Sequence, residues 1–256
     1  MFNAMDSPSR QHLIVQRLRE TERLDVADLA LELDTSEVTV RRDLDALAAA
    51  GALRRVHGGA VSLLLRGEEL PFALREVESS TAKEAIAAAV AGMISDGEAV
   101  ILDSGTTGLA LARRLVNRRL TVVPLSLPAA HVLSASPETT LKVPGGTSRF
   151  GEGSLVGPMT EASLRALRVD TAIISCCGLS MADGVTAYDD VEAATKRAAM
   201  ASARRTILVG EAAKFVRTAL AVVCPLNEFD VLVTDDETPQ DTLDELRRAG
   251  IEVRVA

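Results

Sequence analysis

The sequence predicts an α/β protein of two domains, in which a small N-terminal domain precedes a larger one built on a parallel β-sheet. The length of 256 residues suits two domains, and the first sixty residues show helical periodicity followed by a short basic hairpin. After residue 81, apolar strand-like runs alternate with helix-like stretches. Such alternation is typical of a parallel sheet covered by helices.

Three helices are predicted in the N-terminal domain. Residues 8–22 carry apolar side chains at helical spacing and form the first. Asp25 can cap a second helix that ends near Leu33. Ser36 can cap a third over Glu37–Ala50, because a serine side chain accepts a hydrogen bond from the free amides of a first turn.

The third helix presents two different faces. Its predicted buried stripe consists of Val40, Leu44 and Leu47. Arg42 projects almost opposite Val40, with Val38 beside it and Arg41 on the flank. Guanidinium groups suit guanine edges and phosphates, and an exposed methyl-bearing side chain suits thymine. We therefore expect this helix to lie in the major groove of duplex DNA; a solvated basic face is the alternative.

A β-hairpin is predicted after the third helix. Two short strands, 53–56 and 60–61, flank a Gly58-Gly59 reversal. Arg54, Arg55 and His57 place cationic donors on this hairpin. Helices followed by such a wing predict a winged helix-turn-helix over residues 7–62, with the helix-turn-helix itself at about 24–43.

The charge of the chain is sorted rather than uniform. The net charge of −8 by itself argues against nucleic-acid binding, and residues 1–62 hold eight arginines against ten acidic residues. The acidic residues, however, lie mainly in the first two helices and their connections, whereas the third helix and the hairpin collect arginines. Local charge therefore permits DNA contact.

Other classes of protein are not expected. No apolar run approaches the ~18 residues of a membrane span, and the N-terminus lacks the basic-then-apolar layout of a signal peptide. Cys176, Cys177 and Cys224 have no metal-ligand spacing. We expect reduced thiols in a cytoplasmic protein, without a metal, a cofactor or a membrane partner.

The larger domain is expected over residues 81–256, after a linker at 63–80. The predicted strands are Ala99–Leu102, Leu120–Val123, Leu141–Val143, Ala172–Ser175, Ile207–Val209, Val231–Val233 and Ile251–Val255. After an initial helix that starts at Thr81, the predicted helices are Gly108–Asn117, Pro128–Ser134, Thr160–Leu167, Val191–Arg204 and Thr242–Ala249. Ligands of such sheets bind beyond the carboxyl ends of the strands.

The first strand-to-helix turn is a candidate anion site. It consists of Asp103, Ser104, Gly105, Thr106, Thr107 and Gly108. Free amides at a helix start, hydroxyl groups and a glycine that permits close approach together form an anion cradle. An ordinary capped turn is the alternative.

Further candidates follow other strands. They are Gly145, Gly146, Cys177, Asp189 and Lys214. A glycine pair also serves simply to turn the chain, and a single lysine is also found solvated. Glu192 and Lys196 are spaced four residues apart, and we interpret them as a pair that stabilises a helix.

At this point the N-terminal residues resemble a known signature. Ser36-x-x-Thr39-Val40-Arg41-Arg42-Asp43-Leu44, followed by Gly51-x-Leu53-x-Arg55-x-His57-Gly58-Gly59-Ala60, is similar to that of the DeoR family of bacterial regulators. The resemblance implies that Ser36, Thr39, Arg41 and Arg42 contact DNA and that the His57–Gly59 turn lies against its backbone. Asp43 turns towards the core, so we expect it to form an intramolecular salt bridge.

The larger domain resembles the family's effector domain, which is similar to the fold of ribose 5-phosphate isomerase. The matching stretches include Leu102-Asp103-x-Gly105-Thr106-Thr107, Gly145-Gly146, Val156-Gly157-Pro158, Gly184-x-Thr186, Glu192-x-x-x-Lys196, Lys214-Phe215 and Thr234-Asp235. The resemblance implies that the Ser104–Thr107 loop holds a phosphate and that Lys214 faces the ligand.

Three positions depart from the family's pattern. Leu125 replaces the asparagine of Thr-Asn-Ser-Leu, and Cys177 replaces the aspartate of Gly-Ala-Asp-Gly. Asp189 stands where asparagine is common. The departures imply that phosphate capture is retained while the part that reads sugar hydroxyls is altered.

The combined features predict a homo-oligomeric repressor of carbohydrate-metabolism genes whose affinity for operator DNA is modulated by a phosphorylated sugar or related metabolite. Two alternatives remain. One is a sugar-phosphate isomerase with a DNA-binding head, in which the Cys177 thiolate would have to serve as the base. The other is a regulator that ignores metabolites, a reading that the lost polar positions favour.

Overall fold

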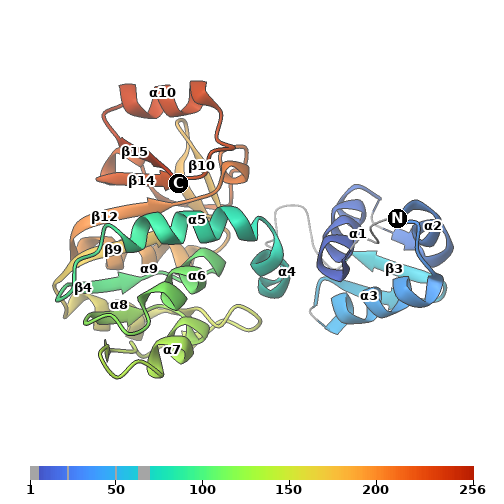
Figure 1. Ribbon diagram of the computed structural model, residues 1–256, viewed down its shortest axis with the longest axis horizontal. Coiled ribbons are helices and arrows are strands. Elements are labelled where there is room, and N and C mark those ends of the chain that lie inside the picture. Colours follow the sequence, from blue (N-terminus) through green and yellow to red (C-terminus); the bar gives the residue numbers. More distant parts are fainter. Residues whose placement is uncertain (1–5, 22, 50, 63–69) are drawn as a thin grey trace. The chain divides into compact units, whose positions relative to one another are not determined.

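The computed structural model describes residues 6–256 except 22, 50 and 63–69, and it divides into two compact units, residues 1–78 and 79–256 (Figure 1). Each unit has its own hydrophobic core. In the part of the chain that the structure describes, no helix is long and apolar enough to cross a membrane.

The first unit is a winged helix-turn-helix. Its helices are α1 (Ser7–Thr21), α2 (Val26–Glu32), α3 (Glu37–Ala49) and α4 (Phe72–Val77). Its strands are β1 (Arg23–Asp25), β2 (Leu53–Val56) and β3 (Gly59–Ser62), which form an antiparallel sheet in the order β1-β3-β2. The expected helices and hairpin are confirmed within one or two residues, and Ala50 lies outside the described residues.

Two predicted helix caps are present. The Asp25 carboxylate accepts a hydrogen bond from the Ala27 amide at 2.8 Å, and the Ser36 hydroxyl accepts one from the Thr39 amide at 3.2 Å. Strand β1 was not predicted, because three residues between two helices carry no alternating pattern. Its pairing with β3 requires Gly59, since a Cβ there would lie 2.0 Å from the Leu24 carbonyl oxygen.

Helix α4 lies within the expected linker, whose residues 63–69 are outside the described part of the chain. Leu70 and Leu74 are buried in the core of the first unit. The Arg75 Nε donates a hydrogen bond to the Leu70 carbonyl at 2.8 Å, and its guanidinium lies 5.6 Å from the centre of the Phe72 ring. The segment before residue 79 is therefore a packed part of the first unit.

A seven-stranded parallel sheet forms the centre of the second unit. Its order is β15-β14-β12-β9-β4-β5-β6. The strands are β4 (Ala99–Leu102), β5 (Thr121–Pro124), β6 (Thr140–Leu141), β9 (Val169–Ser175), β12 (Ala203–Val209), β14 (Val231–Thr234) and β15 (Glu252–Val255). Each predicted apolar run of the larger domain thus forms a strand of one parallel sheet.

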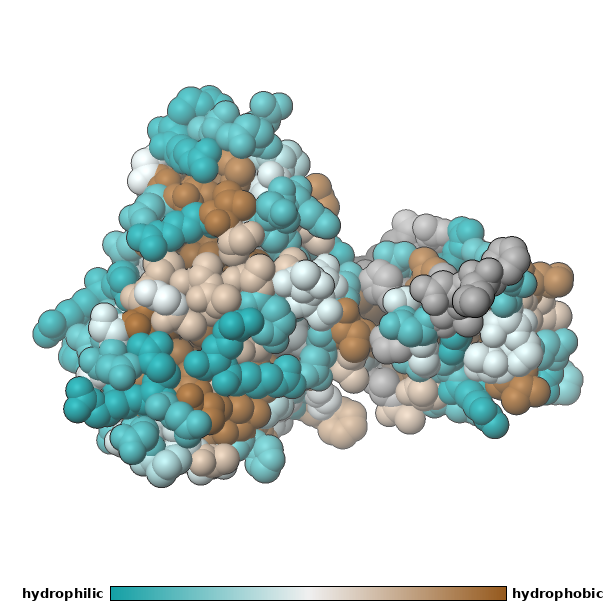
Figure 2. Space-filling model, viewed as in Figure 1, coloured by the Kyte–Doolittle hydropathy of each residue, from teal (hydrophilic) through white to brown (hydrophobic). Residues whose placement is uncertain are grey.

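Helices cover both faces of this sheet (Figure 1). One core lies under α5 (Ser80–Ala91), α6 (Thr106–Leu115) and α7 (Leu127–Ser134). The other lies under α8 (Pro158–Arg165), α9 (Asp190–Ala201) and α10 (Gln240–Arg248), the last of which forms a hydrophilic end of the unit (Figure 2). Side chains alternate between the cores along a strand: Val100 and Leu102 face the first, and Ile101 faces the second.

One predicted helix end was wrong. The helix expected over Val191–Arg204 ends at Ala201, and Ser202 is its C-cap. Ala203 already belongs to β12, where it pairs with Val169 of β9. Pairing along the sheet overrides the helical propensity of the sequence here.

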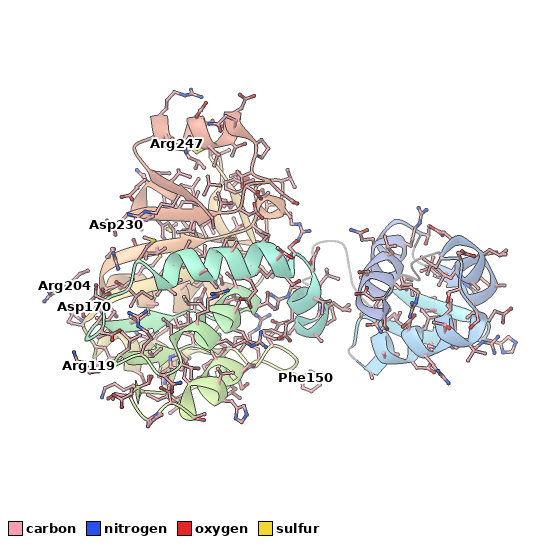
Figure 3. The ribbon with its side chains drawn as sticks, in the orientation of Figure 1. Arg119, Phe150, Asp170, Arg204, Asp230 and Arg247 are labelled. Carbon is pink, nitrogen blue, oxygen red and sulfur yellow. The ribbon has the colours of Figure 1, made fainter. Side chains whose placement is uncertain are left out.

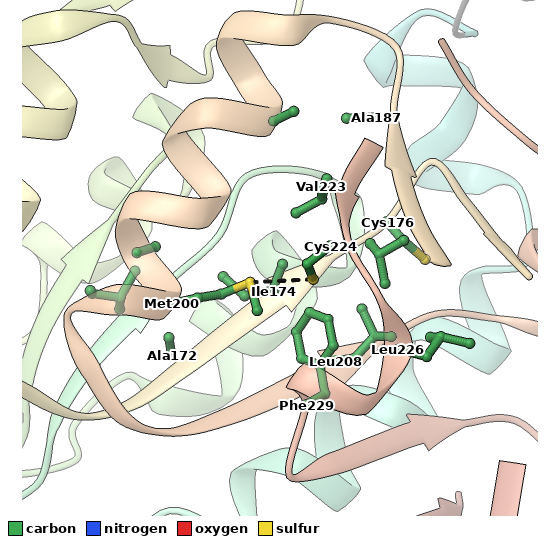
Figure 4. Close-up of a cluster of buried hydrophobic side chains, with 14 of the residues drawn as sticks. Ala172, Ile174, Cys176, Ala187, Met200, Leu208, Val223, Cys224, Leu226 and Phe229 are labelled. Atoms are coloured by element: carbon green, nitrogen blue, oxygen red, sulfur yellow. Dashed lines mark hydrogen bonds between the residues drawn. The ribbon is translucent and has the colours of Figure 1, made fainter. Parts of the chain in front are cut away.

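Short antiparallel strands were missed. β10 (Gly178–Ser180), β11 (Gly184–Ala187) and β13 (Ala221–Cys224) form a small sheet, and β7 (Thr147–Ser148) pairs with β8 (Leu155–Val156) in a hairpin. Cys224 of β13 is buried with its sulfur 3.8 Å from that of Met200 (Figure 4). Strands this short leave too little periodicity in a sequence to be recognised.

Candidate DNA-binding face and anion site

The exposed face of α3 carries the residues expected to read DNA. Val40, Leu44 and Leu47 are completely buried, as predicted. Val38 is 60% exposed, which is high for a valine on a helix that packs against a core. Arg42 is exposed and forms no ion pair within the described residues.

The start of α3 holds three more of the predicted contacts. The Ser36 and Thr39 hydroxyl groups are hydrogen-bonded to each other at 2.9 Å. Arg41 is exposed, and its Nη2 lies 2.7 Å from the Glu37 carboxylate, one turn earlier. An ion pair so exposed contributes little to stability, so the guanidinium can exchange its partner for a phosphate at small cost.

The wing is fixed to α3 by Arg55. Its Nε lies 2.9 Å from the Asp45 carboxylate, and its Nη1 donates a hydrogen bond to the Gly59 carbonyl at 2.8 Å. His57 and Gly58 are exposed in the turn, where Gly58 has a φ of +77°. The guanidinium of Arg55 thus holds the hairpin, and a DNA contact by this residue stays a prediction.

Asp43 forms the expected intramolecular salt bridge. It is buried, and its carboxylate pairs with the Arg10 guanidinium and accepts a hydrogen bond from the Ser7 hydroxyl at 2.8 Å. Burial opposes ionisation of this carboxyl, but the hydrogen bonds from Arg10, Ser7 and Gln11 outweigh it and lower its pKa. Asp43 therefore joins α3 to α1 and does not face DNA.

The turn between β4 and α6 has the form of an anion cradle. Gly105 has a φ of +101°, and a Cβ on Gly108 would lie 2.4 Å from the Asp103 carbonyl oxygen, so both positions require glycine. Ser104, Thr106 and Thr107 are largely buried, but their hydroxyl oxygens remain accessible to solvent and form no hydrogen bond within the described residues. The first amides of α6 also have no acceptor inside the helix.

Asp103 supports this turn. Its carboxylate accepts hydrogen bonds from the Ser175 amide and hydroxyl, each at 2.8 Å, and the Ser175 hydroxyl lies 2.9 Å from the Ser104 carbonyl. It also pairs with the Lys196 ammonium. These partners occupy the Asp103 carboxylate, and a direct contact of Asp103 with an effector stays a prediction.

Lys196 is the centre of a buried ion-pair network. It is 1% exposed and lies between Asp103 and the Glu192 carboxylate, which is 3.1 Å from its Nζ. Burial opposes its charge, but Asp103 and Glu192 outweigh burial and raise its pKa. On its other side Glu192 is 2.8 Å from Arg149, whose Nε is 3.7 Å from Asp189.

The sequence did not reveal this network. Lys196 and Glu192 were interpreted as a pair that stabilises a helix, and Arg149 was not considered. The spacing of four residues shows that Lys196 and Glu192 share a face of α9, but only the fold brings Asp103, 93 residues away, to the same ammonium group. Asp189, a predicted effector residue, caps α9 by accepting from the Val191 amide at 2.7 Å.

A second buried group of charges lies at the end of β12. Lys214, in the short 3-10 helix Ala212–Lys214, is 9% exposed and pairs with Glu211 at 3.5 Å. Burial opposes ionisation of Glu211, but the charges of Lys214 and Lys83 outweigh it and lower its pKa. Lys83, on α5, is 4% exposed and was not predicted to take part. The buried Asp235 carboxylate also lies here and accepts a hydrogen bond from the Ala212 amide at 3.0 Å.

Two of the three cysteines, Cys176 and Cys177, lie near both the Lys196 and the Lys214 groups of charges. Cys176 and Cys177 are buried, and both Lys214 and Lys196 influence the Cys176 thiol electrostatically. Burial nevertheless raises the pKa of this thiol to about 12. Within the described residues, no group of His, Cys, Asp and Glu side chains could hold a metal ion.

Gly145 and Gly146 pack against helix α8. The Thr160 hydroxyl donates a hydrogen bond to the Gly145 carbonyl at 2.6 Å, and a Cβ on Gly146 would lie 2.0 Å from the Thr160 oxygen. Close packing accounts for the pair, and its contact with an effector stays a prediction.

Comparison with known families decides the identity of both units. The model of the DeoR-like helix-turn-helix domain matches residues 10–64, and that of the DeoR C terminal sensor domain matches residues 78–236. The chain belongs to the DeoR family. It is therefore a DNA-binding transcription regulator, as the sequence predicted.

Similar proteins match over nearly their full length. Transcriptional repressor AccR of Agrobacterium fabrum is 35% identical over 93% of this chain and 92% of its own. The glycerol-3-phosphate regulon repressor of Haemophilus influenzae is 32% identical over 91% of each chain. Among solved structures, ribose 5-phosphate isomerase A from Methanocaldococcus jannaschii has a TM-score of 0.39 and 16% identity over 52% of this chain and 53% of that one.

Proposed function

We propose that this DeoR-family protein is a repressor of carbohydrate-metabolism genes whose operator affinity is modulated by a phosphorylated sugar or polyol. The observation that carries the proposal is the β4–α6 turn, in which Gly105 has a φ of +101° and the hydroxyls of Ser104, Thr106 and Thr107 form no hydrogen bond within the described residues. These hydroxyl oxygens are open to solvent, so they remain available, with the first amides of α6, to donate hydrogen bonds to a bound anion.

A phosphate group suits them best. Hydroxyls and free backbone amides are donors, and a phosphate offers several charged acceptor oxygens to a helix N-terminus. Lys214, buried at the end of β12, adds a positive charge at the carboxyl end of the same sheet. A relative named for the glycerol-3-phosphate regulon supports a phosphomonoester.

The DNA-binding side of the proposal rests on α3. Arg42 and Val38 read base edges in the major groove, and Ser36, Thr39 and Arg41 contact the backbone. His57 and Gly58 of the wing lie along the phosphates. We propose that the protein is a cytoplasmic homo-oligomer, in which two DNA-binding heads would match half-sites one helical turn, ~34 Å, apart.

The enzyme alternative is weaker. Isomerisation requires a base whose pKa lies near neutrality. The position that resembles the family's aspartate holds Cys177, which is buried, and the neighbouring Cys176 thiol has a pKa of about 12. We propose that the chain does not turn over sugar phosphates.

Thermal-shift titration with glycerol 3-phosphate and with inorganic phosphate tests the anion site. Wild-type protein is expected to gain stability with concentration, because a ligand that binds the native state stabilises it by mass action. Thr106→Val with Thr107→Val should weaken binding at least about tenfold, since each hydrogen bond to a charged group contributes about 1.5–3 kcal/mol.

The control is Thr121→Val, which makes the same change at the amino end of β5. This control variant should bind glycerol 3-phosphate and inorganic phosphate as tightly as the wild type does. Equal binding by the double variant and the control would refute the anion site, and the absence of any shift in wild type would refute the phosphorylated effector.

A further inference from the structure

The β7–β8 hairpin is hydrogen-bonded to the end of the sheet that carries the anion turn. The Leu155 amide donates a hydrogen bond to the Leu125 carbonyl at 2.9 Å, and the Leu125 amide donates one to the Leu102 carbonyl at 2.8 Å. Leu102 ends β4 and directly precedes the turn. Leu125 follows β5, the neighbour of β4 in the sheet. The hairpin therefore lies at the carboxyl end of the sheet, beside the strand next to the turn.

Side chains join the same hairpin to the turn by a second route. The Arg149 Nη1 lies 2.8 Å from the Glu192 carboxylate, which lies 3.1 Å from the Lys196 ammonium. This ammonium pairs with Asp103, the first residue of the turn, and its Nζ lies 3.3 Å from the Ser175 hydroxyl. One route through the backbone and one through charged groups thus lead from the hairpin to the start of the turn.

The two cations of this network differ in the donors that they have left. The Lys196 ammonium has three N–H groups, faces the three acceptors just named, and is 1% exposed. A guanidinium has five N–H groups, and in the Arg149 side chain only Nη1 donates a hydrogen bond within the described residues. The Arg149 side chain is 26% exposed. Arg149 therefore has donors available to a ligand, whereas Lys196 does not.

The surroundings of Arg149 favour a neutral ligand group over an anion. Its guanidinium lies 2.8 Å from Glu192 and 3.7 Å from Asp189, so two carboxylates already offset its charge. These carboxylates would repel a second phosphate or a carboxylate of the ligand. A hydroxyl group both accepts and donates hydrogen bonds, so it can accept from Arg149 and donate to Asp189.

We propose that Arg149 recognises the hydroxyl-bearing end of the effector: the phosphate lies in the Ser104–Thr107 turn, and the Arg149 guanidinium, together with Asp189, binds hydroxyl groups of the attached polyol. The proposal rests on the proposed function, because it places the phosphate of the effector in that turn. Glu192 and Lys196 fix the position of Arg149 relative to Asp103 and are positioning residues.

The experiment compares inorganic phosphate with glycerol 3-phosphate, which adds a polyol to the same phosphate group. Calorimetry on the full-length protein at constant ionic strength measures both affinities for wild type, Arg149→Met and Arg165→Met. Arg165 of α8 is the matched control, because it also pairs with a glutamate, Glu161 at 2.5 Å, but is 64% exposed and lies outside the network. Thermal unfolding without ligand verifies that each variant is folded.

Arg149→Met should weaken the binding of glycerol 3-phosphate at least about tenfold, the effect of one hydrogen bond to a charged group, and change that of phosphate less than about twofold. Arg165→Met should bind both ligands as the wild type does. Equal weakening for both ligands, or weakening of neither, overturns the proposal. If Arg149→Met does not fold, Arg149→Lys replaces it and should show the same selective loss, because lysine keeps the charge but lacks the planar fork.

A third ligand tests the preference for a neutral group. 3-Phosphoglycerate carries a carboxylate where glycerol 3-phosphate carries a hydroxymethyl group. It should bind wild type at least about fivefold more weakly than glycerol 3-phosphate, because Asp189 and Glu192 repel the added charge. Equal or tighter binding of 3-phosphoglycerate overturns the assignment of Arg149 to hydroxyl groups. Failure of the proposed function gives a different result, in which wild type binds neither inorganic phosphate nor glycerol 3-phosphate.

Discussion

The two candidate binding regions of this protein, the exposed face of α3 and the carboxyl ends of the parallel sheet, are built in opposite ways. On α3 the residues predicted to read DNA are exposed, and Arg42 is held by no ion pair within the described residues. At the carboxyl ends of the sheet the charged residues are buried and paired, with Lys196 only 1% exposed. A surface that reads DNA must offer free donors, whereas an internal site must be organised before its ligand arrives.

Removing the centre of the buried network is expected to have the largest effect. Lys196→Met leaves the Asp103 and Glu192 carboxylates buried beside an apolar side chain, which should cost about 3–5 kcal/mol of unfolding free energy. Urea denaturation measures this loss. The control Arg204→Met changes a side chain that is 85% exposed and should have an effect within about 0.5 kcal/mol. Equal losses in the two variants would contradict the role of Lys196.

Asp43 allows the role of a buried ion pair to be tested within the first unit as well. Asp43→Ala should destabilise this unit by about 3 kcal/mol at neutral pH, because Arg10 loses its buried partner. The Asp43 pKa is lowered in the folded state, so its stabilisation is present above the ordinary value of 3.8 and is lost as pH falls through the lowered value. Denaturation at several pH values should show the variant and the wild type converging in acid.

The control for Asp43 is Asp45→Ala, which removes an exposed carboxylate two residues away. It should cost at most about 1 kcal/mol. A difference between Asp43→Ala and wild type that stays constant down to acid pH would show that packing, not the ion pair, holds the two helices together.

Removal of an exposed arginine should weaken DNA binding and leave the free energy of unfolding unchanged. Arg42→Ala is expected to leave stability unchanged and to weaken specific operator binding by about 1–3 kcal/mol, the contribution of a guanidinium that reads a base. Fluorescence anisotropy on specific and random duplexes measures it. Arg204→Ala is the control on the other unit, and equal affinity of the two variants would remove Arg42 from the reading set.

The smallest effect is expected at the tip of the β7–β8 hairpin. Phe150 is fully exposed and projects away from the rest of its unit (Figure 3). Phe150→Ser should change the unfolding free energy by less than about 0.5 kcal/mol, because no packing is lost. A larger loss in urea denaturation would show that Phe150 makes packing contacts that its exposure does not reveal.

The sequence predicted the first region better than the second. Val40, Leu44 and Leu47 define a helical stripe, and this periodicity alone indicates that Arg42 and Val38 point outwards. The strands of the large sheet were also recognisable, since a strand buried on both faces is apolar throughout. The turn between β4 and α6 could be proposed as an anion site because its residues adjoin in the chain.

The buried charges could not be found in the same way. Lys196 meets Asp103 across 93 residues, and Lys83 acts on Glu211 from another helix. Such contacts depend on strand order and helix placement, which local patterns do not specify.

The central claim is that anion binding in the Ser104–Thr107 turn controls DNA binding. The most direct measurement is operator affinity, with and without inorganic phosphate at constant ionic strength, for wild type and for Thr106→Val with Thr107→Val. We predict that phosphate changes the wild-type affinity at least about fivefold and leaves that of the variant unchanged. An equal response of the two proteins to phosphate would contradict the claim.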